Sequence, residues 1–169
     1  KTPSDRIAIT IIGQDYRKPS QDVITATQTA VDPIVNSGEG EGFAPIGHRV
    51  TITGVEETTV NIETTITYES GYTAEALKSY INQTIDEYLL NLRKEWENKE
   101  TIIVRILQIE AAVVNIKGII DVADTKINGK AENLQITDGT VPIKGGYHMH
   151  INVEYPDVVI DIREIKSMH

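Results

Sequence analysis

The hydrophobic positions change their spacing several times along the chain, and each change marks an expected element. Across residues 73–96, apolar side chains recur every three or four positions, which is typical of a helix with one buried face. These side chains are Leu77, Ile81, Ile85, Tyr88, Leu89, Leu92 and Trp96. Thr73 is an expected N-cap, and Glu75 places a negative charge in the positive first turn. The pattern predicts a long helix packed on a core.

Residues 49–68 follow a strand pattern instead. In the second half of this stretch, one face of the predicted strand carries Val60, Ile62, Thr64, Ile66 and Tyr68. Asn61, Glu63 and two threonines take the opposite face, as in a half-buried antiparallel strand. Residues 7–12 are apolar on both faces, which predicts a central strand covered on both sides.

Two further helices are predicted from their ends. Ser20 is an expected N-cap for a helix that Pro33 either ends or kinks. A second helix is expected over residues 105–117, where apolar side chains again recur at helical spacing. Gly118 follows it at the position where a left-handed residue closes many helices.

The C-terminal third has the pattern of strands. Residues 119–127 predict a strand, and the Asn-Gly pair at 128–129 favours a type I′ turn. We expect residues 133–137 to return antiparallel, and residues 147–155 to form a final strand. Residues 158–162 carry one more strand pattern, at a sheet edge or in a partner.

Together these elements predict an α+β fold. We expect a small β–α lobe at residues 1–46, followed at residues 47–169 by a larger lobe of antiparallel strands packed on two helices. The Gly-rich run at residues 38–42 is interpreted as a flexible connector. A phosphate-binding loop would open a helix and usually contain a Lys, whereas here Glu alternates with Gly and a strand follows.

Composition excludes several classes of partner. The formal net charge of −9 disfavours nucleic acid and anionic membranes, and the chain has no Cys for disulfides or thiolate metal sites. No apolar run is long enough to span a bilayer. With one Phe and one Trp, the core must be aliphatic. Because the chain begins at Lys1, we expect it to be part of a longer protein.

An ordered series of short motifs joins the predicted elements. The motifs are Ala-Pro-Ile-Gly at 44–47, Tyr-Leu at 88–89, Gly-Ile-Ile-Asp-Val at 118–122, Asn-Gly at 128–129, Asn-Leu at 133–134 and Val-Pro-Ile-Lys-Gly at 141–145. Their order and spacing resemble the C-terminal half of the bacteriophage baseplate J-like family. The resemblance covers residues 44–153 well and residues 6–35 more loosely, and the sequence beyond Pro156 has no counterpart in it.

The resemblance implies a structural function. Its members are wedge subunits of contractile-tail baseplates, which are made in the bacterial cytoplasm and dock the hub, the sheath and outer baseplate proteins. It implies no catalysis, no cofactor and no small-molecule substrate, and it allows self-association in the full assembly. A binding module of a phage-tail-like secretion machine is an alternative, because such machines use the same parts.

His148 and His150 are the best metal candidates, because residues two apart on a strand share a face. They support a second alternative, a metal-dependent hydrolase. Such a site needs a third ligand, for which His48 and Glu154 are candidates. We favour surface or interface histidines, and we assign no metal ligand.

Other candidate chemistry is weaker, and we assign no catalytic residue. The carboxylate pairs Asp121/Asp124 and Glu56/Glu57 are expected by chance in so acidic a chain. The serines lack a Gly-x-Ser-x-Gly elbow; they are Ser20, Ser37, Ser70, Ser79 and Ser167. Three aromatic residues at intervals of eight, at positions 80, 88 and 96, could form a partner-binding stripe on the long helix, although the border of a core face is the commoner role.

Overall fold

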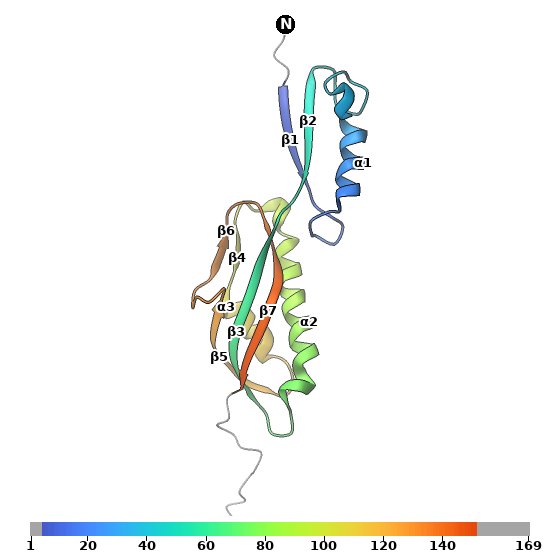
Figure 1. Cartoon of the computed structure of the whole chain (residues 1–169). Helices are drawn as coiled ribbons and strands as arrows, with labels where there is room; N and C mark the ends of the chain where they lie inside the picture. The colour runs from blue at the N-terminus through green and yellow to red at the C-terminus, as the bar shows by residue number, and fades with distance from the viewer. Residues whose placement is uncertain (1–4, 152–169) are drawn as a thin grey trace, which may run out of the picture. The chain divides into compact units, whose positions relative to one another are not determined.

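The computed structural model describes residues 5–151 and confirms the α+β fold. These residues form three α-helices and seven strands arranged in mixed sheets (Figure 1). The chain divides into two compact units. Unit 1 consists of Lys1–Thr58, Arg93–Ile102 and Ile136–Val141, and unit 2 of Thr59–Leu92, Ile103–Gln135 and Pro142–His169. None of the helices within residues 5–151 is long and apolar enough to cross a membrane.

The units are bounded differently from the predicted lobes. That residues 1–46 and 47–169 form two separate lobes stays a prediction. In the structure, the strand that follows residue 46 belongs to unit 1, because it pairs in parallel with the first strand.

Unit 1 is built on a parallel β–α–β arrangement. Strand β1 (Asp5–Ile11) leads to helix α1 (Gln21–Val31), and β2 (His48–Gly54) returns beside β1. A short 3-10 helix, η1 (Ile34–Asn36), follows α1, and a second, η2 (Trp96–Asn98), also belongs to this unit. Ser20 caps α1 as predicted, since its Oγ accepts a hydrogen bond from the Val23 amide at 3.4 Å.

Helix α1 covers β2, and the small core of unit 1 lies between them. Its buried members are Ala44, Val50 and Ile52, with Ile11, Ile24 and Val31 packed against them. The prediction that residues 7–12 form a central, doubly covered strand is wrong. β1 is one strand of a two-stranded sheet, and all its residues from Asp5 to Thr10 are exposed. The apolar residues on both faces of β1 therefore do not show that other elements pack on both faces.

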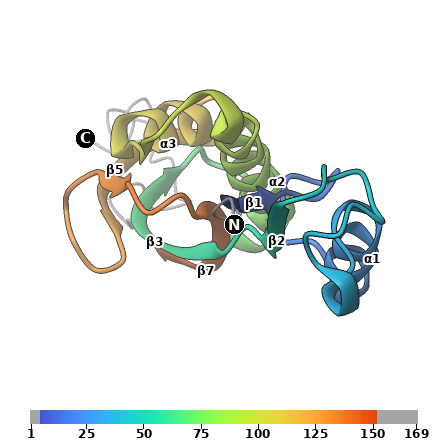
Figure 2. The same ribbon diagram turned by 90° about the horizontal axis from the view of Figure 1, so that it is seen from above.

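Unit 2 is a three-stranded sheet with helices on one side. The strand order is β5 (Ile119–Ile127), β3 (Glu57–Tyr68), β7 (Val141–Ile151), and β3 and β5 are antiparallel. Figure 2 shows α2 (Ala74–Arg93) and α3 (Ile106–Val114) on the same side of this sheet. The arrows in Figure 1 show β7 running in the direction of β3, so this sheet is mixed rather than wholly antiparallel.

The predicted faces of unit 2 are the buried ones. β3 buries alternate residues, and α2 buries one stripe. The fully buried large side chains of these two elements are Val60, Ile62, Ile66, Ile81, Ile85 and Leu89. Thr73 Oγ1 accepts from the Ala76 amide at 3.1 Å and so caps α2 as predicted. Local periodicity was therefore a sufficient guide to both elements.

The turn at residues 128–129 forms as predicted, but the strand after it pairs elsewhere. Asn128 and Gly129 both have positive φ, and the Lys130 amide donates to the Ile127 carbonyl at 3.0 Å. Only one bridge continues this hairpin. β6 (Leu134–Ile136) then pairs with β4 (Ile102–Val104), so the expected antiparallel return onto residues 119–127 is wrong.

The last described strand begins earlier than predicted. β7 starts at Val141 and runs through Gly145 and Gly146, which we had expected to precede it. A Cβ on Gly145 would lie 2.2 Å from Asn61 Oδ1, and the Gly146 amide donates to the same oxygen at 2.7 Å. The glycines make room for the Asn61 side chain inside the sheet, which is a use of Gly in a strand and not a break. Residues 152–155 of the predicted strand, and the strand pattern at residues 158–162, lie outside the described residues.

Candidate functional site

His148 and His150 lie on the face of the unit 2 sheet that also carries Glu63. His150 Nε2 is 2.7 Å from Glu63 Oε1. This hydrogen bond is the main cause that holds the pKa of Glu63 below its usual value. The pair is exposed, with 61% and 43% of the two side chains accessible. The strand thus presents a polar, hydrogen-bonded face.

The structure brings no third metal ligand to these histidines. Within residues 5–151, no group of three or more His, Cys, Asp and Glu side chains could hold a metal ion. His48 lies on β2 in unit 1, where its Nε2 is 3.8 Å from Asp5 Oδ2. Glu154 lies outside the described residues. The hydrolase alternative gains no support, and the absence of catalytic and metal residues stays a prediction.

Glu56 and Glu57 are engaged in ion pairs. Lys18 Nζ lies 2.7 Å from Glu56 Oε1, and Arg17 Nη2 lies 2.9 Å from Glu57 Oε2. The hydrogen bond from Arg17 is the largest cause of the lowered pKa of Glu57. A carboxylate stabilised in its charged form is a poor proton donor, so Glu57 is not suited to be the acid of such a couple. Asp121 and Asp124 are exposed on β5.

The three aromatic residues do not form a stripe on one helix. α2 ends at Arg93, so Trp96 lies in η2 and not on the long helix, which corrects that expectation. Trp96 Nε1 donates to the Gly139 carbonyl at 2.8 Å. The Tyr88 hydroxyl accepts from the Arg105 amide at 2.9 Å, next to the start of α3. Tyr80 is 59% exposed and is the one of the three that is open for a partner.

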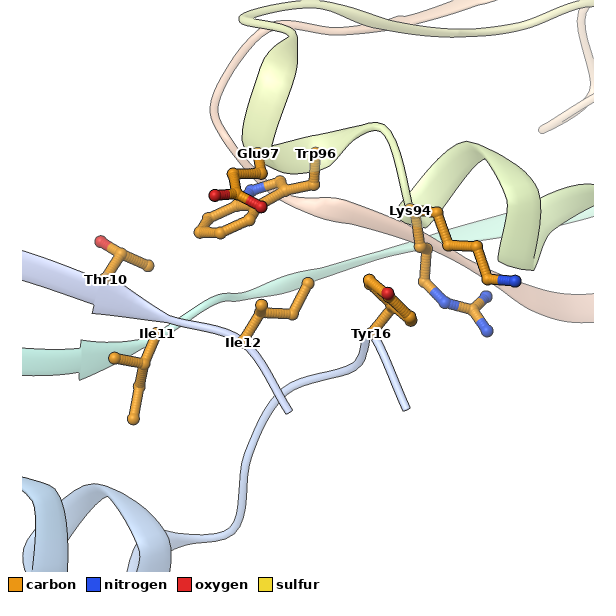
Figure 3. Close-up of a pocket in the computed structure, with 8 residues that line it drawn as sticks. Thr10, Ile11, Ile12, Tyr16, Lys94, Trp96 and Glu97 are labelled. Carbon is orange, nitrogen blue, oxygen red and sulfur yellow. The ribbon is translucent and has the colours of Figure 1, made fainter. Parts of the chain in front are cut away.

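A pocket of about 440 Å³ lies in unit 1 beside the end of β1. Figure 3 shows Ile12, Tyr16 and Trp96 around it, with Lys94 and Glu97 at its margin. The Lys94 ammonium lies 6.0 Å from the centroid of the Tyr16 ring, at the limit of a cation–π contact. No His, Ser or Cys lines the pocket, so it offers no nucleophile–base pair of that kind.

The Gly-rich stretch after α1 is tied down, which corrects its interpretation as a flexible connector. The buried Asp32 carboxylate accepts from Ser37 Oγ at 2.7 Å, from the Gly38 amide at 2.9 Å and from the Val50 amide at 2.8 Å. These three bonds, the Ser37 bond first, lower the pKa of Asp32. The Phe43 and Ala44 amides then bond to the last carbonyls of α1. The stretch is a shaped loop held within unit 1.

This loop presents apolar side chains to solvent. Four large ones are between 79% and 91% exposed: Ile34, Val35, Phe43 and Ile46. We call them the apolar loop. Single exposed apolar residues are ordinary, but four in one hydrogen-bonded stretch make this loop a candidate surface for contact with another protein. Sequence reasoning missed this surface, although the only Phe of the chain, directly after the Gly-rich run, was an available signal.

Comparison with known proteins assigns the family. Residues 60–146, which run from β3 into β7, match the family model described as the baseplate J-like protein C-terminal domain. The chain belongs to the baseplate J-like family. This confirms the resemblance drawn from the short motifs. It associates the chain with bacteriophage and prophage tails and with a structural role related to the baseplate.

Two relatives come from Bacillus subtilis (strain 168). The uncharacterized protein YqbT is 32% identical over 139 residues, which cover 82% of this chain and 38% of that protein. The phage-like element PBSX protein XkdT is 30% identical over 139 residues, with the same coverage of both chains. The chain therefore spans less than half the length of these curated relatives, and it corresponds to one part of them.

Proposed function

We propose that this baseplate J-like chain is a structural, non-enzymatic part of a wedge protein in a phage or prophage contractile-tail baseplate. In this role it docks the hub, the sheath and outer baseplate proteins. The match of residues 60–146 to the family's C-terminal domain carries the proposal. The name of XkdT, a protein of a phage-like element, points to the same setting.

The two units supply what such a part needs. Unit 2 has a closely packed aliphatic core, which holds its surfaces in fixed positions. Unit 1 carries the apolar loop, whose side chains contribute little to the fold because they are so exposed. Glu39 and Glu41 are exposed in the same loop. A partner with an apolar hollow and a basic rim is complementary to this surface.

Location in the particle tests the proposal first. An antibody against this chain is used to label tails purified from the induced source bacterium, and the label is located by electron microscopy. Label at the baseplate end of the tail is the expected result. Intact tails without label, with the protein left in the unassembled fraction, would contradict the proposal.

Substitution tests the docking surface separately. Full-length protein carrying Phe43→Asp replaces the natural protein in the source bacterium, and the yield of complete tails is counted. We expect a loss of at least tenfold, because a charge at an 87% exposed apolar contact opposes docking without disturbing the core. Phe43→Leu, which keeps an apolar side chain at the same position, is the matched control. Yields of Phe43→Asp equal to those of Phe43→Leu and of the natural protein would remove Phe43 from the docking surface.

A further inference from the structure

The pocket of unit 1, beside the end of β1, is lined by two aromatic rings. Figure 3 shows the Trp96 and Tyr16 rings near Ile12, which contributes an aliphatic side chain to the same pocket. The Trp96 indole N–H donates to the Gly139 carbonyl at 2.8 Å, so its polar atom already has a partner within unit 1. Trp96 therefore offers an occupant of the pocket apolar ring surface.

Tyr16 is held at the pocket by a tight turn with an unfavourable backbone conformation. The Tyr16 amide donates to the Gly13 carbonyl at 2.9 Å, and the Gly13 amide donates to the Arg17 carbonyl at 2.8 Å. Within this turn Tyr16 has φ of +58°, in the left-handed region that Gly and Asn adopt more easily. The residue is also 36% exposed, so its ring is not a member of the core. A bulky residue kept in such a conformation points to a function of its side chain.

Two adjacent cationic side chains make this pocket attractive to an anionic group. Arg93 and Lys94 both line it. Among the described residues, Lys94 forms no ion pair, and its ammonium lies 6.0 Å from the centroid of the Tyr16 ring. Figure 3 shows Glu97 next to Trp96 and away from Lys94. An anionic group is therefore favoured at the Lys94 end of the pocket and opposed at the Glu97 end.

We propose that this pocket receives an apolar side chain, with an Asp or Glu beside it, from a neighbouring protein of the baseplate. Tyr, Trp and Arg are the residue types that contribute most binding energy at protein interfaces, and all three line the pocket. The inserted side chain covers the two rings, and the carboxylate beside it pairs with Lys94. The volume of about 440 Å³ lies within the range of binding pockets. This inference rests on the docking role proposed above, and it adds a site that shares no residue with the apolar loop.

Fluorescence of Trp96 in the purified chain tests the pocket directly, because the chain has no other Trp. The probe is the blocked peptide Gly-Phe-Asp-Gly, compared with Gly-Phe-Asn-Gly, Gly-Phe-Lys-Gly and Gly-Ala-Asp-Gly. We expect the Phe-Asp peptide to change the Trp96 emission saturably and to bind about threefold more tightly than the Phe-Asn peptide, as an exposed ion pair allows. The Phe-Lys and Ala-Asp peptides should bind more weakly still. No saturable change with any peptide, or equal binding of the Asp, Asn and Lys peptides, would overturn the proposal.

Variants of the lining residues separate binding from folding, which circular dichroism checks for each protein. Lys94→Glu should remove the preference for the Phe-Asp over the Phe-Lys peptide. Lys78→Glu, at an exposed position in unit 2, changes the net charge equally and should keep the preference. Tyr16→Ala should abolish saturable binding, whereas Tyr16→Phe keeps the ring and should retain it. An unchanged preference in Lys94→Glu would contradict the charge assignment and with it the proposal.

The same substitutions in the full-length protein distinguish this inference from the baseplate role. In the source bacterium, Lys94→Glu and Tyr16→Ala should lower the yield of complete tails about tenfold, as expected for a central interface contact. Lys78→Glu and Tyr16→Phe should leave the yield unchanged. Antibody label at the baseplate together with natural yields of all four variants would overturn the pocket inference and leave the baseplate role standing. Tails without label would contradict the baseplate role, whatever the purified chain binds.

Discussion

The two units differ in how far helices cover their sheets. In unit 2, two helices lie on one side of three strands, and the isoleucines at the centre of β3 are fully buried. In unit 1, a single helix covers β2 and leaves Ile7 and Ile9 of β1 about 40% exposed. Unit 1 also carries the four side chains of the apolar loop. Unit 2 is the more closely packed of the two, and unit 1 is the one for which we propose a docking role.

This difference in exposure is the physical basis of the proposed docking role. Burying an apolar side chain is favourable by about 1.5–3 kcal/mol, so a fold that leaves several exposed forgoes that stabilisation unless another chain supplies the cover. Gln28 and Asp32 form hydrogen bonds to the free edge of β2. The two strands of this sheet therefore differ, because β1 leaves Ile7 and Ile9 about 40% exposed. Four experiments would break or sharpen the comparison.

The largest effect is expected in the core of unit 2. Ile85 on α2 is fully buried, and Ile85→Ala should lower the free energy of unfolding by about 2–5 kcal/mol through lost burial and a residual cavity. Urea unfolding of the natural chain and the variant measures this change in the free energy of unfolding. Ile9→Ala on β1 removes the same atoms at a 39% exposed position and should cost well under half as much. Equal costs at the two sites would abolish the contrast between the units.

The second effect concerns a left-handed glycine in unit 2. Gly118 has φ of +97°, and a Cβ there would lie 2.4 Å from the Tyr72 ring. Gly118→Ala should cost about 1–2 kcal/mol for the backbone alone, and more for the displaced ring. Gly129 has φ of +79° with nothing within 4 Å of a built Cβ, so Gly129→Ala measures the backbone cost by itself. Similar losses for both variants in thermal unfolding would show that the Tyr72 contact relaxes freely.

The third effect is an acid sensitivity of unit 1. The folded pKa of Asp32 lies below its ordinary value of 3.8, because Ser37 and two amides bond to the charged form. A depressed pKa stabilises the fold above the ordinary value, and that stabilisation is lost as pH falls below about 3.8. The protection of the β2 amides, corrected for the intrinsic pH dependence of exchange, should fall in acid. Asp32→Asn should already exchange faster at neutral pH and depend less on acid. Glu57 acts in the same direction, so some dependence remains.

The smallest effect has the opposite sign. The Tyr147 hydroxyl on β7 is buried and has no hydrogen-bond partner among the described residues, and burial raises the pKa of Tyr147. Tyr147→Phe should therefore stabilise unit 2 by up to about 1 kcal/mol, since an unsatisfied buried hydroxyl costs free energy. Tyr68→Phe is the control, because the Tyr68 hydroxyl contacts Met149 Sδ at 3.6 Å. A destabilised Tyr147→Phe would point to a partner for that hydroxyl.

Sequence patterns predicted most of the elements of this fold because those elements depend on neighbours along the chain. Each of these features depends on residues only a few positions apart. They are the buried stripe on α2, the alternation in β3 and the N-caps Ser20 and Thr73. The positive φ of Gly118 and the turn at residues 128–129 follow from the same local chemistry. The family, too, was recognisable from short motifs that lie at these joints.

Candidate surfaces were harder to predict, since a surface is defined by what does not pack on it. An apolar pattern does not reveal whether other elements cover the strand. The apolar strand β1 is an example, since most of its residues are exposed. The Gly-rich loop was expected to be flexible, and only the contact of Asp32 with Gly38 and Val50 reveals that it is held. Similarly, nothing near β6 in the sequence marks β4 as its partner.

The sequence by itself determined the periodic elements, their caps and turns, and the family, because backbone preferences and short motifs are local properties. Only the tertiary structure decided which faces were covered. It paired β6 with β4, fitted Asn61 against Gly145, closed β2 with side chains and left β1 and the apolar loop open. Those outcomes depend on contacts between residues far apart in the chain, whose free energies are settled only when the surfaces meet.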